Sequence, residues 1–574
     1  MDKDRKKEQG SGYGKAIPYL VLLGVAAVLV FLNLRYQDRW LDSDMAAEMI
    51  FSRQLSREGG IIASTHWYYS TEFRVLYTQL LMGPLFRFLS SWHVIRTITN
   101  LVFYVLMFVS YLFAVKPLKL KKSYALMTGL VLYLPFSETM VLHMQIGNTY
   151  MSHVIILMFF FGLFLRLAGV GKIKKDETVI AKTAGNVQKA SKDSKKAAEP
   201  SRFMRSVWLL CYMALALVCG MSGVRYLFTM QCPLLLATFL YCLGSDEFAS
   251  FREEPNWGKV RDILKCDSFR YFLYSILGAA GAVVGYGINV AVISKKFVFQ
   301  TYGATNFIEI YYGELFSRLQ DAIGTLLMLF GYIPSKSVLS LRGLVSLFSF
   351  VILGLFIYAV VVAYKKCKDV QKFWVLFLIC AFAINVFVFV FTTSTMVSRY
   401  YITILIFALP VLGLFLQSEK RIVDRFCFIA LLVACLGINS LKCVYSLMTI
   451  DKNADRKKVA AFLVDNGYTF GYATFSNAGI MTELTNGVLE VANIWDPLEL
   501  NDFKWSSPEA YYEEGYWSGE VFLILSEEET EEFAQAPVVT DGKEIYRENG
   551  YVVYLFDGVQ DLKDHAQSRV EASK

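Results

Sequence analysis

Three acidic residues follow the first long apolar run of the chain at close spacing. Asp42, Asp44 and Glu48 come directly after an apolar segment that ends near residue 34. From Asp44 onward apolar and polar residues recur with helical spacing, so we expect a helix with Asp44 at or near its N-terminus. A carboxylate there could be an N-cap, for which Asp is a leading residue. It could equally be a general base or a metal ligand facing a cavity at the lipid–water boundary.

Lone cations stand in two later loops between apolar runs. Arg225 in GMSGVRYLF and Arg399 in STMVSRYYI are each the only basic residue of a short connection. Ionisable groups at membrane depth are costly and are often functional, so both are candidates for binding an anionic group such as a phosphate. The alternative is that each side chain extends to the lipid headgroups.

Three further residues could help to position a substrate. Glu72 and Arg74 could pair with each other, as a structural ion pair, or hold an acceptor and a phosphate. Tyr400 is first of all expected at the membrane interface, with stacking on a sugar ring as the second interpretation. His66 and His143 lack any spacing typical of a metal site, so we expect ordinary interfacial histidines and leave metal ligands unknown.

Membrane-spanning helices must position these residues. The chain has 574 residues, 55% of them hydrophobic, which is too apolar for a soluble protein of this size. A helix of about 20 apolar residues crosses the bilayer and satisfies its own backbone hydrogen bonds. We expect about eleven spans, at 16–34, 94–115, 123–136, 150–168, 207–220, 226–243, 271–293, 343–364, 373–391, 402–417 and 426–442.

Lysine and arginine predict the orientation of these spans. They are enriched before the first span and in the connections at 116–122, 365–372 and 420–425, whereas 137–149 has none. Basic loops stay in the cytoplasm, so we expect a cytoplasmic N-terminus at 1–15 and an extracytoplasmic C-terminus. The net charge of +7 therefore reflects topology and indicates no nucleic-acid partner.

Two long segments are expected on the outer side and one disordered loop on the inner side. The outer segments are 35–93 and 294–342, and GELFSRLQDAIGTLLMLFGYIP in the second is expected to form an amphipathic or re-entrant helix. The Lys-rich loop at 170–206 lacks aromatic residues and is expected to be disordered.

The tail changes character after the last span. We expect a transmembrane domain at 16–442, a soluble α/β domain at 443–558 and an unstructured tail at 559–574. DRKKVAAFLVDNG and AGIMTEL are typical of helices, and YTFGYATF, VLEVANIW, VFLILS, KEIYRE and YVVYLFD of strands. The predicted fold class is thus mainly α: a polytopic membrane helix bundle with a small α/β domain.

The first outer segment resembles the first loop of the C-type (GT-C) glycosyltransferases, among them the protein O-mannosyltransferases and the lipid A aminoarabinose transferases. The shared pattern is an acidic residue after the first span, an Arg nine residues on and a Gly fifteen on, here Asp44, Arg53 and Gly59. Arg96 begins the second span, as an Arg does in those families.

The chain also departs from that pattern. Met45 follows Asp44, where those families usually have Asp-Glu. Their basic-Pro-Pro element is absent, and Glu72-Phe-Arg74 stands near that point. The resemblance covers about 80 residues and the order of spans, so it indicates a superfamily and no particular substrate.

The resemblance implies an enzyme that transfers a sugar from a polyprenyl-phosphate donor to a glycan, lipid or protein acceptor on the outer face of the membrane, with inversion. A lipid phosphate is a good leaving group, so it needs no general acid. Its negative charge needs bound positive charge. The implied roles are base or acceptor-orienting residue for Asp44, support by Asp42, donor phosphate binding by Arg225 and Arg399, and positioning by Glu48, Glu72, Arg74 and Tyr400.

Other expectations stay open. The sequence identifies no certain cofactor, and a divalent metal at the donor phosphate is compatible with the resemblance. The partners would be a polyprenyl-phosphate-linked sugar, membrane lipid and the acceptor. The sequence has no N-x-Ser/Thr sequon, which favours a bacterial plasma membrane. The alternative function is a flippase or a polymerase of lipid-linked saccharides that does not use this transfer mechanism.

Overall fold

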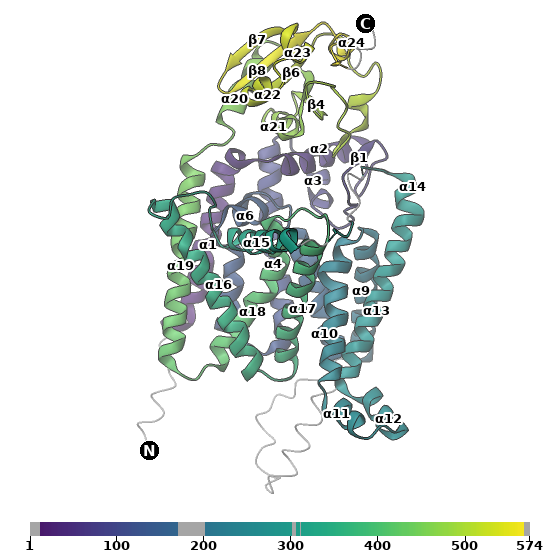
Figure 1. Ribbon diagram of the computed structural model, residues 1–574, viewed down its shortest axis with the longest axis vertical. Coiled ribbons are helices and arrows are strands. Elements are labelled where there is room, and N and C mark those ends of the chain that lie inside the picture. Colours follow the sequence, from purple (N-terminus) through teal and green to yellow (C-terminus); the bar gives the residue numbers. More distant parts are fainter. Residues whose placement is uncertain (1–11, 170–200, 301–305, 310–311, 568–574) are drawn as a thin grey trace.

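The computed structural model describes residues 12–169, 201–300, 306–309 and 312–567, with the side chains of 12–18 and 312–313 left out. A bundle of long helices carries a small α/β domain at one end (Figure 1). The basic residues expected before position 12, most of the Lys-rich loop (170–200) and the last residues (568–574) lie outside the described part.

The helical membrane bundle expected from the apolar runs is confirmed. In the described part, nine helices are long and apolar enough to cross a membrane, and up to eleven if each of two bent pairs counts as one span. The nine are built on α1 (Gly12–Tyr36), α4 (Trp92–Val115), α7 (Met151–Ala168), α9 (Arg202–Met221), α13 (Asp267–Ile288), α16 (Leu341–Lys366), α17 (Asp369–Phe391), α18 (Ile402–Ser418) and α19 (Ile422–Thr449).

The two other predicted spans belong to bent helix pairs and are not straight helices of full length. The span expected at 123–136 is α5 (Lys122–Leu130) with a short 3-10 turn, and it meets the segment Glu138–Ile146 at 91°. Pro135 lies at the break, where a proline removes a backbone donor and forces the preceding residue out of helical geometry. The span expected at 226–243 contains α10 (Cys232–Leu243), and Leu227–Leu243 meets α11 (Asp246–Glu253) at 59°.

The first outer segment folds over one end of the bundle. Helix α2 (Ser43–Glu58) comes first, followed by strand β1 (Trp67–Tyr69) and helix α3 (Gln79–Leu85). The expected helix is present, but its N-cap is Asp42 and not Asp44: the Asp42 carboxylate accepts a hydrogen bond from the Met45 backbone N–H at 2.8 Å. Gly59 ends the helix with a φ of 72°, which favours glycine.

The second outer segment contains the predicted amphipathic helix, α15 (Tyr312–Leu329). It lies across the spanning helices and not along them (Figure 1). The Arg318 side chain donates hydrogen bonds to backbone carbonyls of Phe389 and Val390 at the end of α17, at 3.1 and 3.2 Å. The last carbonyls of a helix receive no hydrogen bond from a backbone N–H of the same helix. Arg318 supplies the missing donors and so fixes the end of α17 and the segment that follows.

A five-stranded sheet forms the C-terminal α/β domain, with strand order β4-β3-β6-β8-β7. Parallel pairing joins β3 to β4 and β6, and antiparallel pairing joins β8 to β6 and β7. The strands are β3 (Phe470–Thr474), β4 (Glu490–Ile494), β6 (Val521–Ser526), β7 (Lys543–Glu548) and β8 (Tyr551–Phe556), and the helices beside them are α20 (Ala454–Asp465), α21 (Phe475–Leu484) and α22 (Glu527–Glu532). The expected strands and helices are all present.

The start of the expected unstructured tail is ordered. Residues Val559–Asp564 form helix α24, and Leu562 of this helix is buried in the core of the domain. Its apolar side chain packs beside Tyr554 and Phe556 of β8, contacts that the sparse apolar pattern of this stretch did not reveal.

A second, small sheet joins three distant parts of the chain. Strand β1 pairs in parallel with β2 (Val298–Phe299) and antiparallel with β5 (Ser507–Pro508). The first outer segment, the end of α13 and the C-terminal domain therefore meet at one place on the end of the bundle.

Candidate functional site

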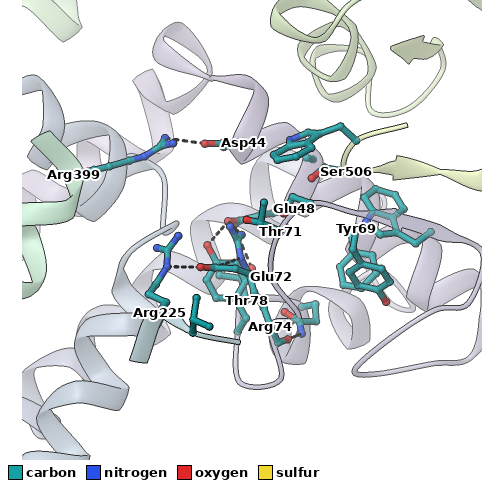
Figure 2. A pocket seen from close by; sticks show the side chains of 18 of the residues that line it. Asp44, Glu48, Tyr69, Thr71, Glu72, Arg74, Thr78, Arg225, Arg399 and Ser506 are labelled. Atoms are coloured by element: carbon teal, nitrogen blue, oxygen red, sulfur yellow. Dashed lines mark hydrogen bonds and ion pairs between the residues drawn. The ribbon is translucent and has the colours of Figure 1, made fainter. Parts of the chain in front are cut away.

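A cavity of about 630 Å³ lies where these three parts meet. Its floor and walls come from α2, the segment after β1, the start of the α10 region, the loop before α18 and a loop of the C-terminal domain (Figure 2). The charged side chains that line it are Asp44, Glu48, Glu72, Arg74, Arg225 and Arg399. Seven of the eight residues singled out from the sequence are thus brought together, because Tyr400 lines the cavity as well.

Asp44 lies in the first turn of α2 and forms an ion pair across the cavity. Its Oδ2 accepts a hydrogen bond from Arg399 Nη1 at 2.9 Å (Figure 2). The Asp44 side chain is 41% exposed and the Arg399 side chain 33%, so both remain open to a molecule in the cavity. The two residues are 355 positions apart in the sequence.

Glu48 follows one helical turn later but is buried. Its carboxylate accepts hydrogen bonds from the Tyr77 hydroxyl, from Thr78 Oγ1 at 3.2 Å and from Arg74 Nη1 at 3.4 Å. Burial raises the pKa of Glu48 to about 7, and the nearby Arg74 charge and the Tyr77 hydrogen bond offset part of that rise. Glu48 is therefore only partly ionised near neutral pH.

Glu72 and Arg225 form the second ion pair of the cavity. Glu72 Oε1 lies 2.5 Å from Arg225 Nε, and Glu72 Oε2 lies 3.8 Å from Arg74 Nε. Arg225 also donates to the Tyr150 hydroxyl at 3.2 Å, and its guanidinium lies 5.7 Å from the centre of the Tyr400 ring. These contacts hold Arg225 toward the cavity, as Figure 2 shows.

The charge balance of the cavity suits an anion. Three arginines and three carboxyl groups line it. Because Glu48 is partly protonated near neutral pH, the arginines outweigh the carboxylates. A negatively charged group entering the cavity would therefore meet a net positive wall.

Asp42 takes a different position from the other candidates. It is not among the residues that line the cavity, and its carboxylate caps α2. Burial raises its pKa to about 6, with the neighbouring Asp44 charge adding to the rise and the hydrogen bond from Met45 opposing it. Its contribution is to start the helix that carries Asp44.

Arg53 and Arg96, both part of the family resemblance, join the membrane bundle to the C-terminal domain. Arg96 is buried and donates to both carboxylate oxygens of Glu483 at 2.7 Å, and to the Met45 carbonyl at 2.8 Å. Arg53 donates to the Gly487 carbonyl at 3.2 Å and lies 3.5 Å from Glu490. The domain is thereby fixed against the helix that carries Asp44 and Glu48.

The carboxylates do not fit a metal site. Within the described ranges, no group of three or more His, Cys, Asp or Glu side chains could hold a metal ion. An arginine faces each of the three carboxyl groups, those of Asp44, Glu48 and Glu72. Its positive charge would repel a divalent cation bound beside it. His66 lies 3.3 Å from Glu58 and His143 2.8 Å from the Thr149 hydroxyl.

Several lining residues were not found from the sequence. Tyr77 and Thr78 bind Glu48, and Trp505 and Ser506 of the C-terminal domain close one wall of the cavity. Trp505 and Ser506 come 400 or more residues after the acidic cluster, and the pairing of β1 with β5 helps to bring them near it. No local pattern could have revealed that pairing; the aromatic and hydroxyl residues of that loop were the only signal.

Comparison with known proteins gives one kind of match. No protein-family model and no curated protein matches the sequence. Among solved structures, ArnT from Cupriavidus metallidurans bound to undecaprenyl phosphate is 12% identical with a TM-score of 0.39, over 95% of this chain and 98% of that chain. The apo state of ArnT gives 12% and 0.36, over 96% and 99%. ArnT is a lipid A aminoarabinose transferase of the C type, the class that the first outer segment resembles.

Proposed function

We propose that this chain transfers a sugar from a polyprenyl-phosphate-linked donor to an acceptor at the outer face of a membrane. One observation carries the proposal: Asp44, Arg225 and Arg399, from three distant parts of the chain, line a single cavity at one end of a membrane bundle.

The residues suit an inverting single displacement. Asp44 takes the proton of an acceptor O–H or N–H group. At the same time a lone pair of that acceptor oxygen or nitrogen attacks the anomeric carbon. The bond between that carbon and the phosphate oxygen breaks, and the phosphate leaves with the electron pair. Arg225 and Arg399 hold the phosphate and stabilise the charge that develops on it. Inversion requires the acceptor and the leaving phosphate to lie on opposite sides of the sugar.

The Asp44–Arg399 pair couples donor binding to the release of the base. Arg399 is the hydrogen-bond partner of Asp44 in this structure, at 2.9 Å. A donor phosphate competes for the same guanidinium, because arginine binds phosphates in bidentate fashion. When the phosphate takes Arg399, the Asp44 carboxylate becomes free to accept a proton.

The cavity would face the outside of the cell. The lysines and arginines of the inner connections, at 116–122 and 365–372, lie at the end of the bundle away from the C-terminal domain (Figure 1). Basic loops are retained in the cytoplasm, so the cavity and the domain would be extracytoplasmic. This supports a multi-pass protein of a bacterial plasma membrane that acts on lipid-linked substrates delivered to the outer leaflet.

Transfer is favoured over flipping by the position of the charges. A flippase needs polar groups along the path through the bilayer. Here the six charged side chains gather in one cavity at one end of the bundle. A saccharide polymerase would also use arginines, but that function would not explain the half-exposed carboxylate opposite Arg399.

The test is a turnover assay in proteoliposomes of the purified chain. A panel of radiolabelled polyprenyl-phosphate sugars is added with an envelope extract as the source of acceptor, and free polyprenyl phosphate and labelled product are measured. We expect both to appear with the wild type, and Asp44→Asn to lower the rate by about 100-fold or more. Asp42→Asn is the matched control, since Asn is as good an N-cap as Asp and should keep most activity.

Two results would overturn the proposal. Movement of intact lipid-linked sugar across the bilayer without release of polyprenyl phosphate would assign a flippase. Unchanged turnover in Asp44→Asn, with Asp42→Asn equally active, would remove Asp44 from the mechanism.

A further inference from the structure

A short helix at the other end of the bundle presents an apolar face outward. Helices α11 (Asp246–Glu253) and α12 (Trp257–Lys265) connect α10 to α13, at the end opposite the C-terminal sheet (Figure 1). None of the residues of either helix is fully buried. Both neighbours in the chain, α10 and α13, belong to the membrane bundle, so α12 is held close to the plane where the spans end.

The apolar residues of α12 lie on one side of the helix. At 100° per residue, Trp257, Val260, Ile263 and Leu264 fall within an arc of about 120°. Trp257 is 88% exposed and Leu264 54% exposed, so a large part of this face is uncovered by the rest of the chain. An uncovered apolar stripe on a surface helix marks contact with a partner or with a membrane.

Cations border the apolar face. Arg261 and Lys265 are both exposed and follow Trp257 on one edge of the stripe. Lys259, on the polar side, is used within the protein: its Nζ donates to the Ser250 carbonyl at 3.0 Å and pairs with Glu254 at 2.9 Å. That contact joins α12 to α11 and fixes the direction in which the apolar face points.

From these positions we infer that α12 lies in the headgroup region of the bilayer and binds anionic lipid. Trp257 and Leu264 enter the acyl boundary, and Arg261 and Lys265 contact the lipid phosphates. A helix with an apolar face, a tryptophan and flanking basic residues is the pattern of helices that lie in the interface. Juxtamembrane basic residues add attraction to anionic headgroups. The inference does not depend on the reaction proposed for the cavity.

Lipid quenching of tryptophan fluorescence tests this inference. The full chain is placed in nanodiscs of phosphatidylcholine, or of phosphatidylcholine with phosphatidylglycerol, each with and without brominated acyl chains. The chain has nine tryptophans. The difference between the wild type and Trp257→Tyr therefore isolates the Trp257 signal, and the difference for Trp495→Tyr, in the C-terminal domain, gives a reference away from the bilayer.

We expect brominated lipid to quench the Trp257 signal and acrylamide to quench it little, with the reverse order for Trp495. Phosphatidylglycerol should increase the lipid quenching of Trp257, and the double variant Arg261→Gln/Lys265→Gln should lose that increase. Quenching of Trp257 by acrylamide alone would place α12 in water and overturn the inference. Protection from both quenchers would assign the face to a protein partner and overturn it as well. Equal quenching in the two lipid mixtures would overturn the inference that α12 binds anionic lipid.

Discussion

Two acidic side chains one helical turn apart have opposite environments in this protein. Asp44 is 41% exposed and opposite Arg399, whereas Glu48 is 6% exposed and bound by Tyr77 and Thr78. The exposed carboxylate is accessible to a substrate proton. The buried one is suited to hold Arg74 and the loop around it in place. Position on the helix, and not residue type, separates the two roles.

Glu48 should make the stability of the protein depend on pH. The ordinary pKa of a glutamate, which applies in the unfolded chain, is 4.5, and the pKa of Glu48 in the folded chain is about 7. The folded chain therefore binds the proton more tightly. The resulting stabilisation is complete below the ordinary pKa and is lost as the pH rises through about 7; it amounts to on the order of 3 kcal/mol. We expect the unfolding midpoint of the wild type to fall over this range, and that of Glu48→Gln to fall less.

The control for this measurement is Asp42, whose pKa is also raised, to about 6. It remains in both proteins, so only the difference between their pH profiles reports Glu48. Parallel profiles for the wild type and Glu48→Gln would contradict the assignment.

Arg399 should contribute to donor binding. Removing a charge-assisted hydrogen bond to a phosphate costs about 1.5–3 kcal/mol, so Arg399→Gln should lower kcat/KM by about 10- to 100-fold, through both kcat and KM. Steady-state kinetics with varied donor concentration measure this. Arg205→Gln is the matched control, since Arg205 lies on α9, outside the cavity, and bonds only to the Tyr274 hydroxyl among the contacts described. An equal loss in both variants would show a general effect on folding.

At this scale the sequence predicted the charged residues of the cavity and missed their uncharged partners. Asp44, Arg225 and Arg399 stand out because isolated charges near apolar runs are rare. Tyr77 and Thr78 do not stand out, since tyrosine and threonine occur throughout the chain and only the fold places them beside Glu48.

Among the elements, α2 depends on two partners, α4 and α21. Arg96 of α4 donates to the Met45 carbonyl of α2 and to the Glu483 carboxylate of α21. A side chain at Gly479 of α21 would meet the Ala46 side chain at 3.3 Å, so α21 packs closely on α2. The helix that carries the proposed base is therefore held from the bundle and from the C-terminal domain together.

Removing Glu483 should loosen that junction. In Glu483→Ala the buried Arg96 loses its carboxylate, at a cost of about 3–5 kcal/mol. We expect a lower unfolding midpoint and faster proteolysis between α19 and β3. Asp455→Ala, which removes an exposed pair with Lys458, should change the midpoint little. Equal midpoints for Glu483→Ala and the wild type would show that the junction does not depend on this ion pair.

Most elements could be predicted from the sequence, and the bent ones could not. Apolar runs of about 20 residues determine the spans, and short, mostly apolar runs flanked by Gly and Asn determine the C-terminal sheet. The turn at Pro135 was missed because the apolar run continues through it, and periodicity does not show the direction of a helix after a break.

For the whole molecule, the charges divide between two ends. The cavity with its six charged residues lies at the end that carries the C-terminal domain. The basic connections and the amphipathic helix α12 lie at the opposite end (Figure 1). This division is the basis for the proposed orientation in the membrane, in which the cavity is expected at the outer face.

Reporter fusions measure that orientation. We expect alkaline phosphatase fused after residue 574 to be active, since it would be exported, and green fluorescent protein at the same position to be dark. The same reporters inserted in the segment 170–200 should give the opposite pair of results. A fluorescent C-terminal fusion with an inactive phosphatase would place the cavity in the cytoplasm.

The central claim is that the lipid phosphate of a donor meets Asp44 within this cavity. An experimental structure of the full chain with bound polyprenyl phosphate tests it most directly. We predict the phosphate within hydrogen-bond distance of Arg225 and Arg399, with the Asp44–Arg399 contact broken and the polyprenyl chain leaving between helices of the bundle. A phosphate bound elsewhere, with the Asp44–Arg399 contact intact, would contradict the claim.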